Sequence, residues 1–472
     1  MSDKTPILVR FRRDLRLSDN AALAAACASG HPVIPVFLND DLVGSLRAAP
    51  KWRLGLGVAN LADHLAEQGS RLILRRGANA LTLLQELITQ TGAGAVYWSR
   101  LYDPETVTRD SDIKQTLKSM GVEVRSFGGH LMFEPWTIAT KTGGYYKVYT
   151  PFWNRVRNIG VDAPRPAPVR FNSPANWPDS DELCDWNMGA AMHRGAAVVR
   201  PFVQLGERAA QARLTYFIEN GVATYRENRD IPSLDGTSNL SENLALGEIT
   251  PHQCWHAGTR ALAEGKAGAE TFLKELVWRE FAYHLMYHTP HILTRSWREE
   301  WQSFDWKSDP SAPEVLAWKQ GRTGIAFVDA AMRELYVTGR MHNRGRMIVA
   351  SYLTKHLRTD WRIGMAWFEA CLIDWDPASN AMGWQWSAGC GPDATPYFRV
   401  FNPETQLDKF DKDRRYADRW IAEGNAAPHK DALCFFDAVP KTWGMRADAS
   451  YPDPIVTAAE GRKAALAAYE KR

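Results

Sequence analysis

The sequence is poor in cysteine and has no long apolar run. Only six of its 472 residues are cysteines, and no two of them form a CxxC pair. A disulfide framework is not expected, nothing suggests an iron–sulfur cluster, and the cysteines are interpreted as small buried hydrophobes. No stretch of about 18 apolar residues occurs, so no membrane span is predicted. The first residues lack the apolar core and cleavage site of a signal peptide, which predicts a cytoplasmic protein.

The sequence also lacks a strong charge of either sign. Its formal net charge is +3, so the overall charge does not mark it as a nucleic-acid binder. Residues 322–362 nevertheless hold eight Lys and Arg against three Asp and Glu. Such a basic stretch can neutralise phosphates, although it is more often a solvated face, so the indication is weak on its own.

The first part of the chain alternates short apolar runs with amphipathic stretches, as in a doubly wound α/β domain with a parallel sheet. It lacks the GxGxxG dinucleotide fingerprint: residues 55–60 read GLGVAN and fall in a predicted helix, so no Rossmann NAD site is supported. The predicted strands are Pro6–Phe11, Val33–Leu38, Leu72–Leu74, Ala95–Trp98 and Val122–Val124, and the predicted helices are Asn20–Ala28, Trp52–Glu67, Asn79–Thr91 and Glu105–Met120.

Residues 135–200 are punctuated by prolines and show no lasting periodicity, which predicts a long linker between domains. Beyond it the strand signals fade and helical periodicity takes over. We therefore expect an α/β domain over 1–134, a linker over 135–200 and an all-helical domain over 201–472. The predicted helices are Gln204–Asn220, Thr250–Gly265, Ala269–Tyr287, Thr323–Val337, Arg340–His356 and Arg362–Leu372.

Two segments of the helical part combine polar groups that suit a ligand. Asp235–Ser241 (DGTSNLS) is a hydroxyl-rich turn before an apolar helical stretch, where hydroxyls and free N–H groups can hold a phosphate. Glu275, Trp278 and Arg279 share one helical face, which suits a flat, hydrogen-bonding ligand. The plainer interpretations are an ordinary N-cap for the first and a surface ion pair beside an incidental tryptophan for the second.

Two further segments follow in the same region. Asn343, Arg346 and Met347 also share a helical face and combine an amide, a cation and a thioether. Asp374, Asp376 and Asn380 lie close together in a predicted loop, where Asp374 could pair with Arg346. Asp and Asn also form turns for purely structural reasons. Each motif is weak alone, and their joint occurrence is the stronger indication.

Taken together, these segments resemble the FAD domain of the photolyase/cryptochrome superfamily. The resemblance extends to Phe11–Asn20 (FRRDLRLSDN), Tyr149–Trp153 (YTPFW) and Pro396–Pro403 (PYFRVFNP), and covers essentially the whole chain. It implies an N-terminal antenna-type α/β domain and a helical domain that binds FAD. It also implies light-driven repair of cyclobutane pyrimidine dimers in UV-damaged DNA, most similar to class I and class III enzymes.

The resemblance assigns roles residue by residue. Arg346 and Asp374 would pair beside the isoalloxazine ring, Asp376 would contact the flavin, Asn380 would lie near its N5, and Asn343 would lie between flavin and substrate. The implied FAD site is Tyr225, Thr237, Ser238, Asn239, Leu240, Ser241, Arg279, Asn343, Arg346, Asp374, Asp376 and Asn380. The implied lesion site is Glu275, Trp278, Met347 and Trp386, the implied catalytic set is Glu275, Asn343, Met347 and Asn380, and the implied electron-transfer chain is Trp384, Trp361 and Trp306.

Alternatives within and outside the superfamily remain open at this point. Repair of (6-4) photoproducts would require paired histidines where this chain has Met341–Met347 with His342 alone, and the family's photoreceptors often replace the residue at Asn380. A blue-light photoreceptor is therefore the second hypothesis, and a light-independent nucleotide- or DNA-binding protein is the third. The latter would be colourless after purification.

The antenna chromophore is less well defined. The resemblance would place the glutamate of the familiar folate site near Thr106, and its Cys-Lys pair near Leu293–Thr294, and neither is present. Methenyltetrahydrofolate held in another way, 8-hydroxydeazaflavin, or no antenna all stay possible. The chain is expected to act as a monomer without bound metal.

Overall fold

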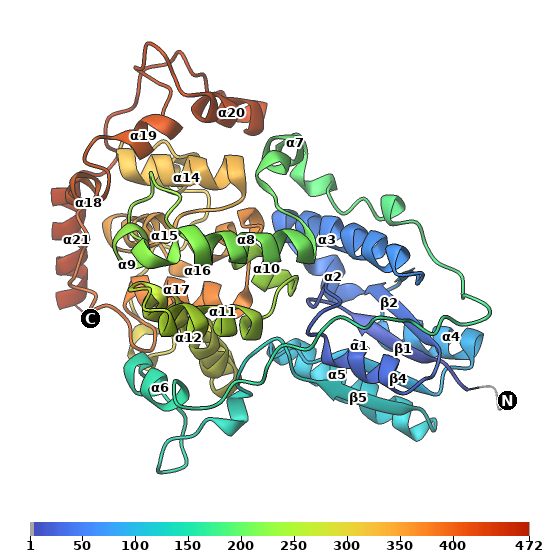
Figure 1. Cartoon of the computed structure of the whole chain (residues 1–472). Coiled ribbons are helices and arrows are strands. Elements are labelled where there is room, and N and C mark those ends of the chain that lie inside the picture. Colours follow the sequence, from blue (N-terminus) through green and yellow to red (C-terminus); the bar gives the residue numbers. More distant parts are fainter. Residues whose placement is uncertain (1–3, 472) are drawn as a thin grey trace.

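A five-stranded parallel sheet forms the first domain of the computed structural model, which describes residues 4–471 (Figure 1). The strands are β1 (Ile7–Phe11), β2 (Val33–Asn39), β3 (Ile73–Arg76), β4 (Ala95–Ser99) and β5 (Glu123–Phe127), in the order β3-β2-β1-β4-β5. The order reverses beside β1, and ligands of doubly wound sheets bind where it reverses, at the carboxyl ends of the strands. All five strands lie where the sequence predicts them, within three residues at each end.

The strands are apolar because both faces of the sheet are covered. Ile7, Val9 and Phe11 of β1 pack with α1 and α3 on one face, whereas Leu8 packs with α4 and α5 on the other. The helices of this domain are α1 (Ala21–Ala28), α2 (Asp41–Ser45), α3 (Ala48–Glu67), α4 (Ala80–Thr91) and α5 (Pro104–Ser119).

The segment from 135 to 200 crosses the molecule and packs against the sheet domain (Figure 1). Val33 N–H donates to the Asn172 carbonyl at 2.7 Å, and Asp181 N–H donates to the Leu74 carbonyl at 2.9 Å. It carries two short helices, α6 (Tyr149–Val156) and α7 (Gly195–Val199). The linker is thus fastened to the first domain by its backbone.

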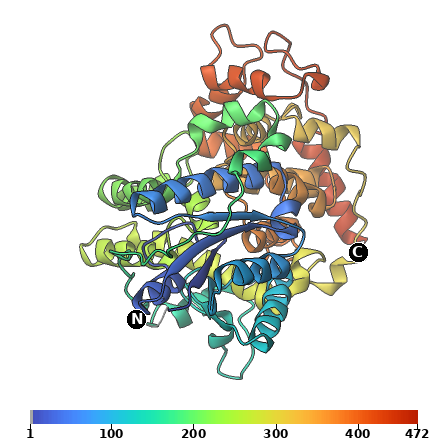
Figure 2. The same cartoon turned by 90° about the vertical axis from the view of Figure 1, so that its right-hand side faces the viewer.

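The rest of the chain is helical, and Figure 2 shows its helices stacked behind and above the sheet. None of the helices in residues 4–471 is long and apolar enough to cross a membrane. The helices are α8 (Gly206–Asn220), α9 (Tyr225–Asn228), α10 (Ser241–Leu246), α11 (Pro251–Ala263), α12 (Ala269–His288), α13 (Pro313–Lys319), α14 (Ala326–Thr338), α15 (Asn343–Ser351), α16 (Trp361–Cys371), α17 (Pro377–Ala388), α18 (Pro403–Phe410), α19 (Arg415–Trp420), α20 (Lys430–Ala438) and α21 (Ala458–Glu470).

Two helical predictions need correction. The helix expected over 340–356 begins at Asn343, capped by the His342 side chain, and its last turn, Tyr352–His356, is π-helical. The expected loop over 374–380 ends at Asp376, because Asp376 caps α17 and Pro377 occupies the first helical position. A proline there lacks only an N–H that has no helical partner, so it starts the helix instead of preventing it.

Buried contacts join the two domains. Arg53 of α3 forms an ion pair of 2.6 Å with Glu248, and both side chains are fully buried. The Leu15 N–H donates to the Leu246 carbonyl. Gly247 follows with a φ of +64°, and a side chain there would collide with the backbone of Arg13. The loop after β1 therefore docks directly on the start of the helical domain.

Candidate functional site

Helix α12 carries a rigid aromatic platform. The indole of Trp278 lies flat on the Tyr149 ring of α6, with ring centroids 3.7 Å apart and planes 4° from parallel. The Tyr149 hydroxyl donates to the Lys274 carbonyl at 2.7 Å, which fixes α6 to α12. Trp278 remains half-buried, so one face is held by tyrosine while part of the ring stays accessible.

Glu275, one turn before Trp278, is paired with Arg229 at the end of α9. The same guanidinium lies 5.4 Å from the centre of the buried Tyr225 ring. Tyr225 packs edge-on against Phe217, and burial raises the pKa of its hydroxyl. Arg229 was not anticipated from the sequence, although an arginine four residues after an aromatic on a short helix is a usable signal.

Arg279 does not join Glu275 in a shared pocket. It donates to the His130 carbonyl at 2.9 Å and contacts Nε2 of His130 at 2.8 Å. Burial, together with Arg279 and other arginines, keeps the pKa of His130 well below its ordinary value, so the imidazole is neutral. Both Arg279 and Tyr283 of the next turn thus hold α12 against the segment that follows β5 in the first domain.

Asp376 is held by protein groups on both carboxylate oxygens. One oxygen accepts from the Ser379 N–H at 2.9 Å, and the other accepts from Arg13 at 3.1 Å and from the Tyr283 hydroxyl. Burial alone would raise the pKa of Asp376, but Arg13, Arg279 and these hydrogen bonds lower it below its usual value. Its contact with a flavin therefore stays a prediction, whereas its structural role is plain.

Arg346 and Asp374 form the pair expected from the sequence. The Arg346 guanidinium donates to Oδ2 of Asp374 at 2.7 Å and, through Nε, to the Met341 carbonyl at 2.9 Å. Asp374 is buried, and its Oδ1 has no hydrogen-bond partner among residues 4–471. The carboxylate is thus fixed in orientation with one acceptor oxygen left over for a ligand.

Asn380 lies on the first turn of α17. Its amide nitrogen donates to the Met365 carbonyl of α16 at 3.1 Å, which orients the amide. Its Oδ1 is buried and, like that of Asp374, finds no partner in the described part of the chain. Buried acceptors without partners are rare and costly, so two of them six residues apart indicate a ligand with N–H donors.

Asn343 and Met347 lie one turn apart on α15, and the Asn343 amide contacts the Met347 sulfur at 3.9 Å. Asn343 is exposed and Met347 half-buried, which leaves both accessible. Gly345 between them packs against α14 so closely that a side chain would press on Ala331. Helix α15 thus packs closely against α14 on one side, while its face with Asn343 and Met347 remains accessible to solvent.

The Thr237–Ser241 turn is held by its own side chains. Asn239, with a φ of +51°, donates to Asp235 at 2.7 Å, and Thr237 donates to the Asn239 side chain at 3.3 Å. The backbone carbonyl of Asn239 accepts a hydrogen bond from Arg213, an arginine of α8 that the sequence analysis did not single out. Leu240 is buried, whereas Ser238 is half-buried and Ser241 exposed. The hydroxyls and a cation therefore border one surface.

The tryptophans assigned to electron transfer differ in exposure. Trp361 and Trp384 are 0% and 2% exposed, whereas Trp306 is half-buried. The Trp384 ring contacts Phe368 edge-on at 4.9 Å, and Gly364 makes room for it. Trp386, the implied lesion contact on the same helix as Trp384, is half-buried. Trp306, the expected outer end of the chain, is thus the most exposed of the three tryptophans. Their role in electron transfer stays a prediction.

A cavity of about 550 Å³ lies between the two domains, at the carboxyl ends of β1, β2 and β4. Arg10 and Arg109 both reach Asp40 at 2.8 Å on its sheet side, and burial lowers the pKa of Arg10 to about 9. Asn380 and Met365 line the helical side. Thr106 and Leu293–Thr294, where the sequence lacks the familiar folate ligands, line the same cavity.

Comparisons with known proteins agree with this geometry. The family model "DNA photolyase" matches residues 7–169, and "FAD binding domain of DNA photolyase" matches residues 272–471. A deoxyribodipyrimidine photo-lyase of Agrobacterium fabrum is 44% identical over 99% of this chain and 98% of its own length. Cryptochrome-1 of Arabidopsis thaliana is 31% identical over 95% of this chain and 68% of its own.

Solved structures give the same result. The crystal structure of a class III photolyase from Agrobacterium tumefaciens is 42% identical and superposes with a TM-score of 0.92, covering 100% of this chain and 98% of that one. Full-length identity of this size, together with both family models, leaves no doubt about ancestry. The chain belongs to the DNA photolyase family.

Proposed function

We propose that this protein is a deoxyribodipyrimidine photolyase that binds FAD and repairs cyclobutane pyrimidine dimers in UV-damaged DNA under blue light. The observation that carries the proposal is the Arg346–Asp374 pair with the unpartnered Oδ1 of Asp374, together with a second unpartnered acceptor, Oδ1 of Asn380 on α17. Bound FAD would supply a reduced, light-excited group that can give an electron to a pyrimidine dimer. The protein's residues position that group and its substrate.

The acceptor atoms fit the hydrogen-bonding edge of a flavin. In our proposal, Oδ1 of Asp374 accepts an N–H of the ring while Arg346 holds the carboxylate still, and Asn380 lies toward N5. Tyr225 and the Thr237–Ser241 turn border the phosphate end, where Arg213 adds positive charge. Asn343 and Met347 cover the opening between flavin and lesion.

The lesion would be received on the α12 platform. A pyrimidine dimer must leave the duplex to reach a buried flavin, at a cost of a few kcal/mol that poorly stacked bases reduce. Trp278, fixed by Tyr149, and Trp386 offer faces for the flipped bases. Stacking of this kind contributes about 1–3 kcal/mol per base. Glu275, oriented by Arg229, presents an acceptor for the pyrimidine edge.

The proposal also includes an electron-transfer chain, an antenna site, and an oligomeric state and location. Trp306, Trp361 and Trp384 would carry electrons from the surface to oxidised flavin. The cavity of about 550 Å³ would hold the antenna chromophore, methenyltetrahydrofolate or 8-hydroxydeazaflavin, next to the helix that bears Asn380. We also propose that the protein acts as a monomer, in the cytoplasm.

The decisive experiment is repair of an oligonucleotide with one thymine dimer by purified, pre-reduced protein, in blue light and in darkness. Light-dependent return of intact thymines supports the proposal, and the matched oligonucleotide with a (6-4) photoproduct should stay unrepaired. If the flavin-loaded protein repairs neither lesion, the photoreceptor hypothesis replaces it.

The antenna proposal has its own test. Leu293→Trp would place an indole in the cavity of about 550 Å³, and Leu262→Trp, on the exposed face of α11, is the matched control. We expect Leu293→Trp to remove antenna absorbance from protein that still carries FAD. Unchanged antenna absorbance in that variant would contradict this location.

A further inference from the structure

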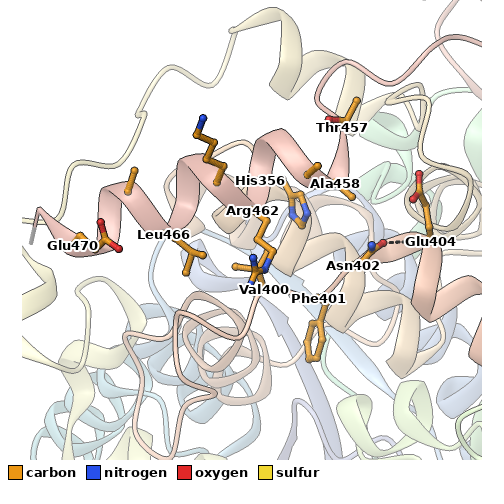
Figure 3. Close-up of a pocket in the computed structure, with 13 residues that line it drawn as sticks. His356, Val400, Phe401, Asn402, Glu404, Thr457, Ala458, Arg462, Leu466 and Glu470 are labelled. Carbon is orange, nitrogen blue, oxygen red and sulfur yellow. Dashed lines mark hydrogen bonds between the residues drawn. The ribbon is translucent and has the colours of Figure 1, made fainter.

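A second, separate pocket lies on the far side of the helical domain. It has a volume of about 750 Å³ and runs between α21 and the segment 400–404 that leads into α18 (Figure 3). Its volume is within the range of small-molecule sites, about 300–1,000 Å³. None of the residues assigned to FAD, lesion or electron transfer lines it. Whatever it binds is therefore distinct from the flavin and its substrate.

The inner end of this pocket contains a buried histidine without partners. His356 closes the π-helical turn after α15 and is 3% exposed; its ring lies beside the Ser351 backbone, and neither ring nitrogen makes a well-aligned hydrogen bond among residues 4–471. Its ring stacks on Tyr352, with centroids 5.0 Å apart, and Gly461 of α21 lies so close that a side chain would collide with it. Figure 3 shows the ring behind α21, between Ala458 and Arg462.

The histidine offers both kinds of hydrogen bond. Burial lowers the pKa of His356 to about 4, so the ring is neutral at physiological pH and has one donor and one acceptor nitrogen. Leaving such groups unpaired in the interior is unfavourable, and a ligand with a complementary polar edge relieves that cost.

The walls and the rim define the rest of the ligand. Val400 and Phe401 form one wall and Leu466 of α21 the other, which suits a flat apolar ring. Arg462 lies at the middle of the groove and reaches toward Val400, whereas Glu404 and Glu470 lie at its opposite ends (Figure 3). The Arg462 side chain forms no ion pair or hydrogen bond within residues 4–471. An acid group beside it would meet an unpaired cation.

We propose that this pocket is a binding site for a small aromatic anion, whose ring lies between Phe401 and Leu466, whose acid group pairs with Arg462, and whose polar edge contacts His356. The site is independent of light and of DNA repair. An exposed guanidinium without a protein partner and a buried imidazole, both lining one groove, suit such a molecule.

The test uses a fluorescent probe of this chemistry on the FAD-loaded full chain. 1-Anilinonaphthalene-8-sulfonate carries an aromatic system and an acid group, and its fluorescence rises on entering an apolar site. We expect saturable binding that is about tenfold tighter than that of the uncharged N-phenyl-1-naphthylamine, because one charge-assisted contact accounts for that factor. Equal affinity for the two probes would overturn the anion assignment.

Matched variants locate the probe. Ala467→Trp fills the groove, whereas Ala464→Trp lies on the same helix outside it, and Arg462→Gln is matched by Arg322→Gln, an exposed arginine elsewhere. Binding should weaken about tenfold in Ala467→Trp, Arg462→Gln and His356→Phe, and stay unchanged in the two controls. If the controls weaken binding equally, or none of the variants does, the probe binds elsewhere and the proposal is wrong. A milder filling, Ala467→Leu, replaces any variant whose flavin absorbance or melting temperature shows misfolding.

Discussion

Trp278 and Tyr149 stack face to face, with ring centroids 3.7 Å apart, although the two residues lie on different helices and are 129 positions apart in the chain. The tyrosine hydroxyl is fastened to the backbone of α12 at Lys274. The stacking partner on the protein side is therefore already in place before any base arrives. An indole held in this way loses little freedom on binding, which favours affinity for a flipped base.

The first prediction concerns this platform. Trp278→Ala should weaken binding of dimer-containing DNA about tenfold, because one stacking contact of about 1–3 kcal/mol is lost, while FAD binding is retained. Tyr149→Leu should show part of this loss, and Tyr149→Phe, which keeps the stack, should show little. Fluorescence anisotropy with dimer-containing and intact oligonucleotides measures the affinities. Equal loss of flavin and DNA in Trp278→Ala would show a structural role instead.

The second prediction concerns the Arg346–Asp374 pair. Arg346→Leu would leave the buried Asp374 carboxylate without its cation, at a cost of about 3–5 kcal/mol in the free energy of unfolding. The flavin content, read from the ratio of visible to ultraviolet absorbance, should fall strongly. Arg446→Leu breaks an exposed pair with Asp448 and should leave stability and flavin content nearly unchanged. Full flavin content in Arg346→Leu would remove this pair from the FAD site.

The third prediction is a pH dependence of stability set by Glu280. One of its carboxylate oxygens accepts the backbone N–H groups of Met132 and Phe133, and burial raises its pKa to about 7. The folded protein therefore binds a proton more tightly than the unfolded chain, whose glutamate has a pKa of about 4.3. The stability that this gives is complete below that value and is lost as the pH rises through 7.

Glu280→Gln should remove this dependence. The variant should unfold at higher denaturant concentration than the parent at pH 8, by up to about 3 kcal/mol, and match it near pH 4.5. Denaturant unfolding curves across this pH range measure the effect, and Glu270→Gln on the exposed start of α12 is the control. A constant difference at all pH values would refute the titration of Glu280.

The fourth prediction separates electron supply from repair. Trp384→Phe should slow photoreduction of oxidised flavin at least about tenfold, because the buried indole nearest the start of the proposed chain is lost. Repair by protein reduced chemically beforehand should be unchanged. Trp318→Phe changes a neighbouring buried indole, 6.1 Å from Trp384, and serves as the comparison. Loss of repair by the pre-reduced variant would assign Trp384 a structural role.

The sequence predicted the architecture well, because the central strands β1, β2 and β4 are buried throughout and mostly apolar, and stand out from the helices between them. The Arg346–Asp374 pair was only an option from the residues alone, and the family resemblance implied it. The loop over 374–380 was wrong beyond Asp376, because Asp376 caps α17 and Pro377 occupies its first turn. A proline directly after an Asp is a recognised signal for a helix start.

The partners of Arg279 and Trp278 could not be predicted from local pattern. Arg279 shares a helical face with Glu275 in sequence, yet it binds His130, which is 149 positions away. Helical spacing shows which side chains share a face but not which distant segment packs there. The same holds for Tyr149, whose place under Trp278 follows from the path of the linker.

The salt bridge between Arg13 and Asp376 makes the helical domain depend on the first domain, so the two must be encoded together. Asp376 caps the helix that carries Asn380, Trp384 and Trp386, so the first turn of that helix depends on a guanidinium contributed by the opposite end of the gene. Separated from residues 1–134, the helical half would also lose the buried ion pair between Arg53 and Glu248. The flavin half is thus not a portable unit that recombination could graft elsewhere. A split or shuffled gene would have to bring both halves together in the same cell.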